Sequence, residues 1–167
     1  VGSLGQLGVL VELTFKVFPV PEDSTTIRAT FSDLDAAIEG LRLLAVSQEE
    51  LMCLDLESPH TVAARIAGLT AAQSARTNRI LAIVEGASTD TLHGDDDRQY
   101  WSTAREFEWL PEGHRLVRIP TTPSKIPPIE QFFASRNATG TRRYSVGGNV
   151  AWLACPPEWK SAELEQL

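Results

Sequence analysis

Three glycines near the start of the sequence have the spacing of a main chain that passes close to a ligand. Gly2, Gly5 and Gly8 are three residues apart, and a run rich in β-branched and aromatic residues, Val9 to Phe18, follows at once. Glycine has no Cβ, so its backbone can approach another group closely or take a positive φ. A dinucleotide-binding fingerprint has its glycines between a strand and a helix, whereas these precede a predicted strand. A ligand contact and a tight structural turn are therefore the two interpretations.

The other polar side chains do not form a recognisable hydrolytic or metal-binding motif. No Ser-His-Asp or Cys-His pattern stands out. His114 and Arg118 are four residues apart on one predicted strand, so a regular strand turns both to the same face. The run Asp95 to Asp97 lacks the Asp-x-Asp-x-Asp-Gly spacing of a calcium loop and suits a solvated turn at a helix N-terminus, where acidic groups favour the helix dipole. We therefore predict no metal site.

Composition narrows the class of protein and of partner. The chain has 167 residues, enough for one domain, with 43% hydrophobic and 22% charged residues and a net charge of −7. An acidic chain without a basic run is a poor candidate for binding nucleic acid or an anionic membrane, and no apolar run is long enough to span a bilayer. Cys53 and Cys155 belong to no CxxC pair and lie in apolar runs, which indicates free buried thiols and a reducing, cytoplasmic setting.

The opening segment, GSLGQLGVLVELTFKVFPVP, resembles the segment that closes the FAD-binding domain of the FAD-linked oxidases related to vanillyl-alcohol oxidase. That family typically reads G-[ST]-x-G-x-L-G-[IV]-[IL]-T-E, then a strand and a pair of prolines. The positions that match are Gly2, Ser3, Gly5, Leu7, Gly8, Val9, Leu10 and Glu12. Val11 stands where the family usually has Thr. The resemblance implies that the residues next to the flavin of FAD are Gly2, Ser3, Gly5, Gly8, Val9 and Leu10.

The later part of the chain resembles one subfamily, the FAD-binding subunit of glycolate oxidase. The shared features are an aromatic helix, a strand of the form [LV]-x-R-[IV]-x-x-P at Leu116 to Thr122, and a hairpin like YSVGGNVAW at Tyr144 to Trp152. Larger relatives carry a G-D-G-N-L-H strand whose His helps to hold a metal. The corresponding stretch here has no His, which argues against a metal-assisted site.

The subfamily resemblance implies a small, glycolate-like 2-hydroxy acid as substrate. A carboxylate is best bound by a bidentate Arg, and Arg118 matches the Arg of the subfamily strand. Arg142 and Arg143, next to the hairpin, are the other candidates. The alternative for each is an Arg that points from the sheet into solvent. No base for the hydroxyl proton is evident.

The resemblance also implies a longer parent protein. The chain begins without Met in what looks like a domain edge, so we expect a piece whose FAD domain lies upstream. Residues 1–21 are then the C-terminal edge of the FAD domain, 22–155 a substrate cap and 156–167 a tail. FAD is expected in the parent and weakly or not at all in this piece alone, with a second flavin subunit and an iron–sulfur subunit as partners. The alternative is a ferredoxin-like binding or assembly module without catalytic function.

The elements that would position these residues are predicted from periodicity and turn signals. We expect strands at 25–31, 50–56, 79–86 and 114–119, helices at 33–45 and 96–109, and a short helix from 58 to about 69. A proline-rich bend, a short helix around 129–133 and a hairpin of 142–146 with 149–154 follow. This order predicts an α+β fold, a ferredoxin-like antiparallel sheet with helices on one face.

The continuous apolar run at 79–86 favours a central strand, with a polar loop at 71–78 before it. The aromatic residues of the 96–109 helix, Tyr100, Trp101 and Phe107, are expected to pack in the core rather than to form a cofactor box.

Overall fold

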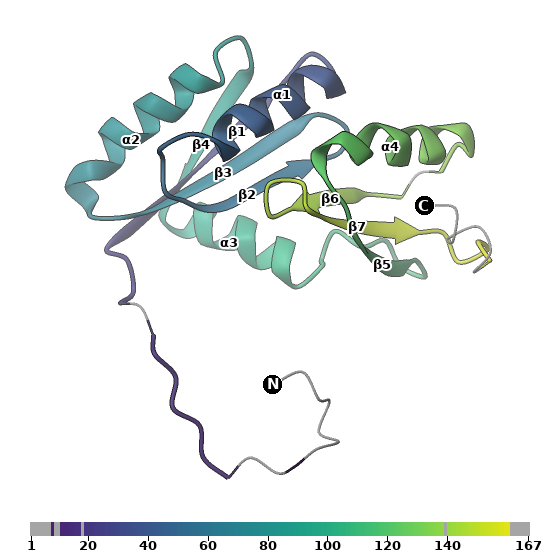
Figure 1. The fold of residues 1–167 in the computed structure, drawn as a ribbon, viewed down its shortest axis with the longest axis horizontal. Helices are drawn as coiled ribbons and strands as arrows, with labels where there is room; N and C mark the ends of the chain where they lie inside the picture. The colour runs from purple at the N-terminus through teal and green to yellow at the C-terminus, as the bar shows by residue number, and fades with distance from the viewer. Residues whose placement is uncertain (1–7, 9–10, 18, 139, 161–167) are drawn as a thin grey trace.

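The computed structural model describes residue 8 and residues 11–17, 19–138 and 140–160. Within these residues seven strands form one antiparallel sheet in the order β4-β1-β3-β2-β6-β7-β5 (Figure 1). The strands are β1 (Asp23–Thr30), β2 (Leu51–Glu57), β3 (Thr61–Gly68), β4 (Ser88–His93), β5 (Arg115–Pro120), β6 (Arg142–Ser145) and β7 (Val150–Cys155). The helices are α1 (Leu34–Ala45), α2 (Thr70–Ile83), α3 (Gly94–Arg105) and α4 (Ile126–Ser135), with a 3₁₀ turn, η1, at Pro123–Lys125.

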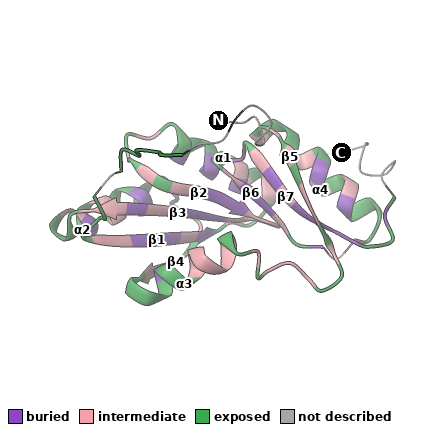
Figure 2. Cartoon of the chain, turned by 90° about the horizontal axis from the view of Figure 1, so that it is seen from below, coloured by how far each residue is buried: buried purple, intermediate pink, exposed green. Residues whose placement is uncertain are grey.

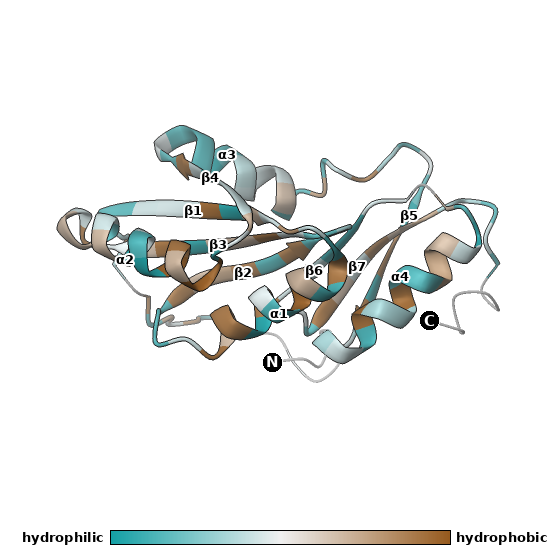
Figure 3. Ribbon diagram, turned by 90° about the horizontal axis from the view of Figure 1, so that it is seen from above, coloured by the Kyte–Doolittle hydropathy of each residue, from teal (hydrophilic) through white to brown (hydrophobic). Residues whose placement is uncertain are grey.

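The first six elements run β-α-β-β-α-β, the element order of the ferredoxin-like motif, and their strands lie in the order β4-β1-β3-β2. The predicted class, an α+β fold around an antiparallel sheet, is confirmed. The prediction that the helices share one face is wrong. Helices α1, α2 and α4 cover one face, which we call the three-helix face, and α3 lies on the opposite face, which we call the α3 face (Figure 3).

The hydrophobic core lies on the three-helix face, between the sheet and the helices α1, α2 and α4 (Figure 2). One row of paired residues crosses five strands, and its members are Ala29, Val62, Leu56, Tyr144 and Ala151. Residues paired across an antiparallel ladder share a face, and all of these are buried. The helices add Leu41, Ile80 and Phe133 to the same cluster. Each such aliphatic or Phe side chain contributes about 1.5–3 kcal/mol by leaving water.

Two adjoining predictions in the first half are wrong. Residues 61–68, predicted as a short helix, form strand β3, and residues 70–83, predicted as a loop and the start of a central strand, form helix α2. Val62 and Ile66 are four residues apart, a spacing that puts both side chains on one face in a helix and also in a strand. Ile80 and Val84 are also four apart, and both are buried on one side of α2 and its cap. The apolar run at 79–86 is therefore the end of a helix.

Strand β4 is not among the predicted strands. The remaining elements after residue 20 agree with their predictions to within a few residues. The spacing of Ser32 and Asp35 predicts Ser32 as the N-cap of α1. The N-cap is instead Asp33, whose Oδ1 accepts from the Ala36 N–H at 2.8 Å. The Gly-Gly hairpin is present, and β6 pairs with β7 from Arg142 to Ser145. Gly147 and Gly148 have φ of 62° and 84°, a conformation that glycine adopts without strain.

The predicted strand at residues 9–18 is not a strand in the part that is described. Residues 11–17 have no regular secondary structure and run away from the sheet (Figure 1). Their alternating apolar side chains, Val11, Leu13, Phe15 and Val17, are 97%, 55%, 74% and 79% exposed. The sequence has the alternation of a half-buried strand, but a strand needs a neighbour for its backbone, and no described segment pairs with it.

Candidate functional site

A cavity of about 770 Å³ opens where β2 and β6 separate. Its aromatic lining lies on the α3 face, while Leu44, Ala45 and Leu54 border it from the three-helix face. We call it the cavity on the α3 face. The two strands pair only at Leu56 with Tyr144 and at Glu57 with Arg143. Two further backbone bonds flank these pairs, from the Ser58 N–H to the Arg142 carbonyl at 3.1 Å and from the Gly147 N–H to the Leu54 carbonyl at 2.8 Å. The cavity lies over this short junction, between β2, the β6–β7 turn and the C-terminal end of α3.

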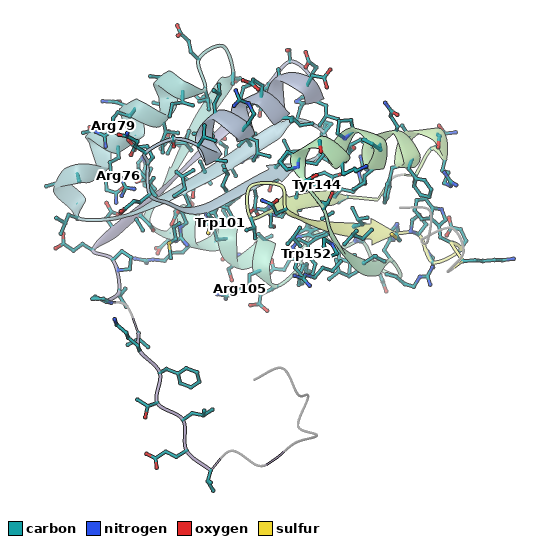
Figure 4. All side chains as sticks on the ribbon, viewed as in Figure 1. Arg76, Arg79, Trp101, Arg105, Tyr144 and Trp152 are labelled. Atoms are coloured by element: carbon teal, nitrogen blue, oxygen red, sulfur yellow. The ribbon has the colours of Figure 1, made fainter. Side chains whose placement is uncertain are left out.

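Aromatic side chains from three segments line the cavity. Trp101 lies on α3, Phe107 just after that helix and Trp152 on β7 (Figure 4). Trp152 pairs with Arg143 across the β6–β7 ladder, so the two side chains share the α3 face. Phe107 packs on Trp152 with ring centroids 5.0 Å apart, and Trp101 Nε1 donates to Thr26 Oγ1 at 2.6 Å. These side chains are half-buried and stand outside the hydrophobic core, so the expectation of core packing is not met.

A buried charge cluster forms the floor of the cavity. Arg143 Nε donates to Asp55 Oδ2 at 2.6 Å, and Ser145 Oγ donates to the same oxygen at 3.0 Å. Arg143 also forms an ion pair with Glu57, and the Tyr100 hydroxyl donates to Glu57 Oε1 at 2.8 Å. The guanidinium is therefore shared between carboxylates on β2, and it fixes β6 against that strand.

The electrostatics of the floor are set by burial. Burial raises the pKa of Asp55 above its usual range, although Arg143 and Ser145 act in the opposite direction. Burial likewise raises the pKa of the Tyr100 phenol. For Arg143 burial disfavours the charge, but Tyr100 and the two carboxylates outweigh it and raise the pKa. Arg143 therefore keeps its positive charge. This charge serves as the counter-ion of Asp55 and Glu57, which is a structural role.

A second polar cluster holds α3 on the sheet. Asp97, in the first turn of α3, is buried and accepts bonds from Ser24 Oγ at 2.6 Å, Thr26 Oγ1 at 2.5 Å and Arg65 Nη2 at 2.5 Å. Burial would raise the pKa of Asp97, but these donors outweigh it and lower the pKa. The acidic run at 95–97 thus begins a helix as predicted, and one of its members is a buried anchor rather than a solvated group.

Arg105, the last residue of α3 (labelled in Figure 4), lines the cavity with an exposed side chain and so lies at its mouth. Its Nε donates to Glu106 Oε1 at 2.9 Å, and both side chains are exposed. Such an exposed pair is worth less than about 1 kcal/mol, so the guanidinium can exchange Glu106 for another anion.

The structure separates the two arginines that the sequence predicts as substrate ligands. Arg118 is exposed on the edge strand β5, with its guanidinium 5.5 Å from the centre of the Trp152 ring, and it does not line the cavity. Arg142 points to the three-helix face, where Nη2 lies 2.5 Å from Glu130 Oε2 and 2.8 Å from Ser58 Oγ. His114 lies just before β5, half-buried.

The predicted flavin contacts fall mostly beyond the described residues. Gly8 is described and exposed, and no atom lies within 4 Å of where a Cβ would stand. The other predicted contacts, which lie outside the described residues, are Gly2, Ser3, Gly5, Val9 and Leu10.

Sequence reasoning missed Asp55 and Arg105 as residues of a site. A signal for Asp55 exists, because Cys53, Asp55 and Glu57 alternate with Leu54 and Leu56 along β2 and mark a strand with one polar face. Nothing in the sequence marks Arg105, which is one of several exposed arginines and gains its place from the end of α3.

In the described part of the chain, no group of three or more His, Cys, Asp or Glu side chains is arranged to hold a metal ion. None of the helices described above has the length and apolar character needed to cross a membrane. No protein-family model matches the sequence. A search of curated proteins finds no match either.

Proposed function

We propose that the chain is the C-terminal part of an FAD-dependent oxidoreductase that oxidises a small 2-hydroxy acid. Residues 1–21 would border the flavin, and the sheet with its cavity would form the substrate cap. The observation that carries the proposal is the cavity on the α3 face, with aromatic walls and arginines at its floor and mouth. Concave, largely apolar sites with a few placed polar groups are typical of small-molecule sites. The link to flavin rests on the resemblance of the opening segment.

The residues available for FAD are compatible with that role. FAD would supply a two-electron oxidation, in which the hydride of the substrate's C2–H bond would pass to the flavin and the hydroxyl proton to solvent, to give a 2-oxo acid and reduced flavin. The residues that would lie against the cofactor are Gly2, Ser3, Gly5, Gly8, Val9 and Leu10. The open surroundings of Gly8 leave main chain accessible there. The exposed alternating residues 11–17 are suited to pairing with the sheet of a preceding FAD domain.

The carboxylate of the substrate would bind a cation of the cavity. Arg105 is the best placed, because it lines the cavity and its bond to Glu106 is exposed. Arg118 remains a candidate through the resemblance, and its guanidinium lies over the ring of Trp152, which lines the cavity. Arg142 is a weaker candidate, because Glu130 and Ser58 occupy its guanidinium on the other face.

The setting proposed for the parent protein also follows the resemblance. It would work in the cytoplasm with a second flavin subunit and an iron–sulfur subunit, and the free thiols of Cys53 and Cys155 fit a reducing compartment.

The proposal is tested by the visible spectrum of a longer protein. The chain is expressed together with the coding sequence before it, about 200 residues for a domain of ordinary size, and purified. A yellow protein with flavin absorption bands supports the proposal. A folded, colourless protein contradicts it and favours the second candidate, a ferredoxin-like binding or assembly module. The observation that favours this second candidate is the exposed apolar series from Val11 to Val17, which could equally pair with a partner protein that has no catalytic role.

A further inference from the structure

We propose that the cavity on the α3 face accepts a 2-hydroxy acid that carries an aromatic group, rather than a two-carbon acid. The inference rests on the proposed function for the reaction, but the binding it describes belongs to this chain alone. The hydride and proton leave the substrate as before, and the product is an aryl-substituted 2-oxo acid.

The size of the cavity is the first argument. Its volume of about 770 Å³ lies in the range of 300–1,000 Å³ that is typical for larger organic ligands. A two-carbon hydroxy acid would fill a small part of this space and leave most of the apolar lining in contact with water. A ring attached to the acid would cover that lining and gain the hydrophobic contribution of its burial.

The chemistry of the walls is the second argument. Trp101, Phe107 and Trp152 come from three separate segments, and Met52 and Cys53 add polarisable sulfur atoms to the lining. Aromatic pairs attract one another in edge-to-face and offset arrangements, and Met sulfur also favours aromatic rings. Nothing in a two-carbon hydroxy acid would use these surfaces.

Charge complementarity is the third argument and selects an acid. The cavity has four charged residues in its lining: Glu49, Asp55, Arg105 and Arg143. Each of the two carboxylates already has an arginine as partner. Asp55 is bound by Arg143 at 2.6 Å and Glu49 by Arg79 at 2.5 Å, so neither presents an uncompensated negative charge.

Arg105 differs from these pairs because its only counter-ion among the described residues, Glu106, is exposed and does not line the cavity. Arg105 and Trp101, labelled in Figure 4, are four residues apart on α3 and line the same cavity, so one ligand can meet both residues. A ring between the aromatic walls and a carboxylate at Arg105 therefore use the cavity and its mouth together.

The test is isothermal titration calorimetry on the 167-residue chain with three ligands: mandelate, glycolate and the uncharged mandelamide. We expect mandelate to bind at least tenfold more tightly than glycolate and about fivefold more tightly than mandelamide. Equal affinity for mandelate and glycolate, or no measurable binding of mandelate, overturns the inference.

Variants locate the binding. Trp152→Ala should weaken mandelate binding about tenfold and Arg105→Ala about fivefold, and Phe107→Leu serves if Trp152→Ala does not fold. The matched controls are Arg98→Ala, another exposed arginine of α3, and Phe132→Leu, an aromatic residue on α4 that does not line this cavity. Equal losses in the control variants overturn the inference.

The flavin spectrum separates this inference from the proposed function. A colourless long protein whose C-terminal chain still binds mandelate refutes the function and leaves the cavity assignment standing. If the long protein contains flavin but the 167-residue chain does not bind mandelate, the proposed function is supported and the cavity assignment is refuted.

Discussion

Arg143 Nε lies 2.6 Å from Asp55 Oδ2, and this pair joins the two parts of the sheet beneath the cavity. Strands β2 and β6, which carry the two residues, share only two backbone pairs. The side chains therefore add to the backbone bonds and the shared core that hold β6 and β7 against β1–β4. The same pair forms the floor of the candidate site, so it contributes both to the stability of the junction and to the shape of the cavity.

Removal of one partner of this pair should be costly. We predict that Arg143→Met destabilises the chain by about 3 kcal/mol, because Asp55 is left charged and buried without its counter-ion. The double variant Arg143→Met with Asp55→Asn should recover part of that loss. The measurement is urea denaturation of the wild type, both single variants and the double variant. Strictly additive losses would show that the two side chains do not interact.

Asp97 should make the chain sensitive to acid. Its folded-state pKa is lowered below 3.8 against burial, chiefly by bonds from Ser24 and Thr26 with Arg65. A lowered pKa means that the stability from this carboxylate is present above about pH 4 and is lost as the pH falls through the folded-state pKa. Asp97→Asn should cost about 3 kcal/mol at pH 6 and show a smaller further loss between pH 5 and pH 2.

The control for Asp97 is Asp95→Asn, two residues earlier on the same helix, where the carboxylate is exposed. It should change the free energy of unfolding by less than about 0.5 kcal/mol at pH 6. Denaturant unfolding at a series of pH values checks both variants. An acid-induced loss in Asp97→Asn as steep as that of the wild type would contradict the assignment.

Gly148 should be irreplaceable in the β6–β7 turn. Its φ is 84°, and an added Cβ would stand 3.0 Å from Leu41 Cδ2 and 3.2 Å from Pro123 Cγ. We predict a loss of about 2–3 kcal/mol for Gly148→Ala, from backbone strain and crowding together. The matched control is Gly113→Ala, because Gly113 has a similar φ of 78° but open space around it. This variant should lose about 1 kcal/mol of stability, from backbone strain alone. The melting temperatures of the two variants should differ in that order, and the reverse order would refute the packing argument.

The segment 11–17 should contribute nothing to the stability of the isolated chain. Leu13→Ser with Phe15→Ser replaces two exposed side chains, so the free energy of unfolding should change by less than about 0.5 kcal/mol. In the longer protein the same double variant should lower the flavin content, because the proposal places this segment against the FAD domain. A loss of stability in the 167-residue chain would show that the segment packs on the cap itself.

The elements that could be predicted are those whose ends are marked in the sequence by capping or turn residues. The spacing of Ser32 and Asp35 predicts the start of the helix 34–45, although the N-cap is Asp33. Gly147 and Gly148 predict the last hairpin, so both elements are placed to within a few residues. The exchange of strand and helix at 61–83 arose because a spacing of four fits both periods, and the tertiary neighbours β1 and β2 decide between them.

The candidate site was less predictable than the fold. Arg142 and Arg143 are adjacent in sequence, but strand alternation sends one to Glu130 on the three-helix face and the other to Asp55 on the α3 face. Arg143 lines the cavity only because α3 packs on the face of the sheet opposite to the other helices. No residue pattern in α3 indicates which face it covers. Arg118 was selected by resemblance, and its guanidinium lies over the ring of Trp152, which lines the cavity.

The central claim is that this chain caps a flavin at which a 2-hydroxy acid is oxidised, and anaerobic reduction tests it most directly. The longer protein, purified with its flavin, is mixed with a 2-hydroxy acid in the absence of oxygen, and its visible absorption is followed. The account predicts that the absorption of oxidised flavin is lost as a 2-oxo acid forms, and that Arg105→Ala requires more substrate for the same rate. A bound flavin that stays oxidised with glycolate and mandelate alike would contradict the account.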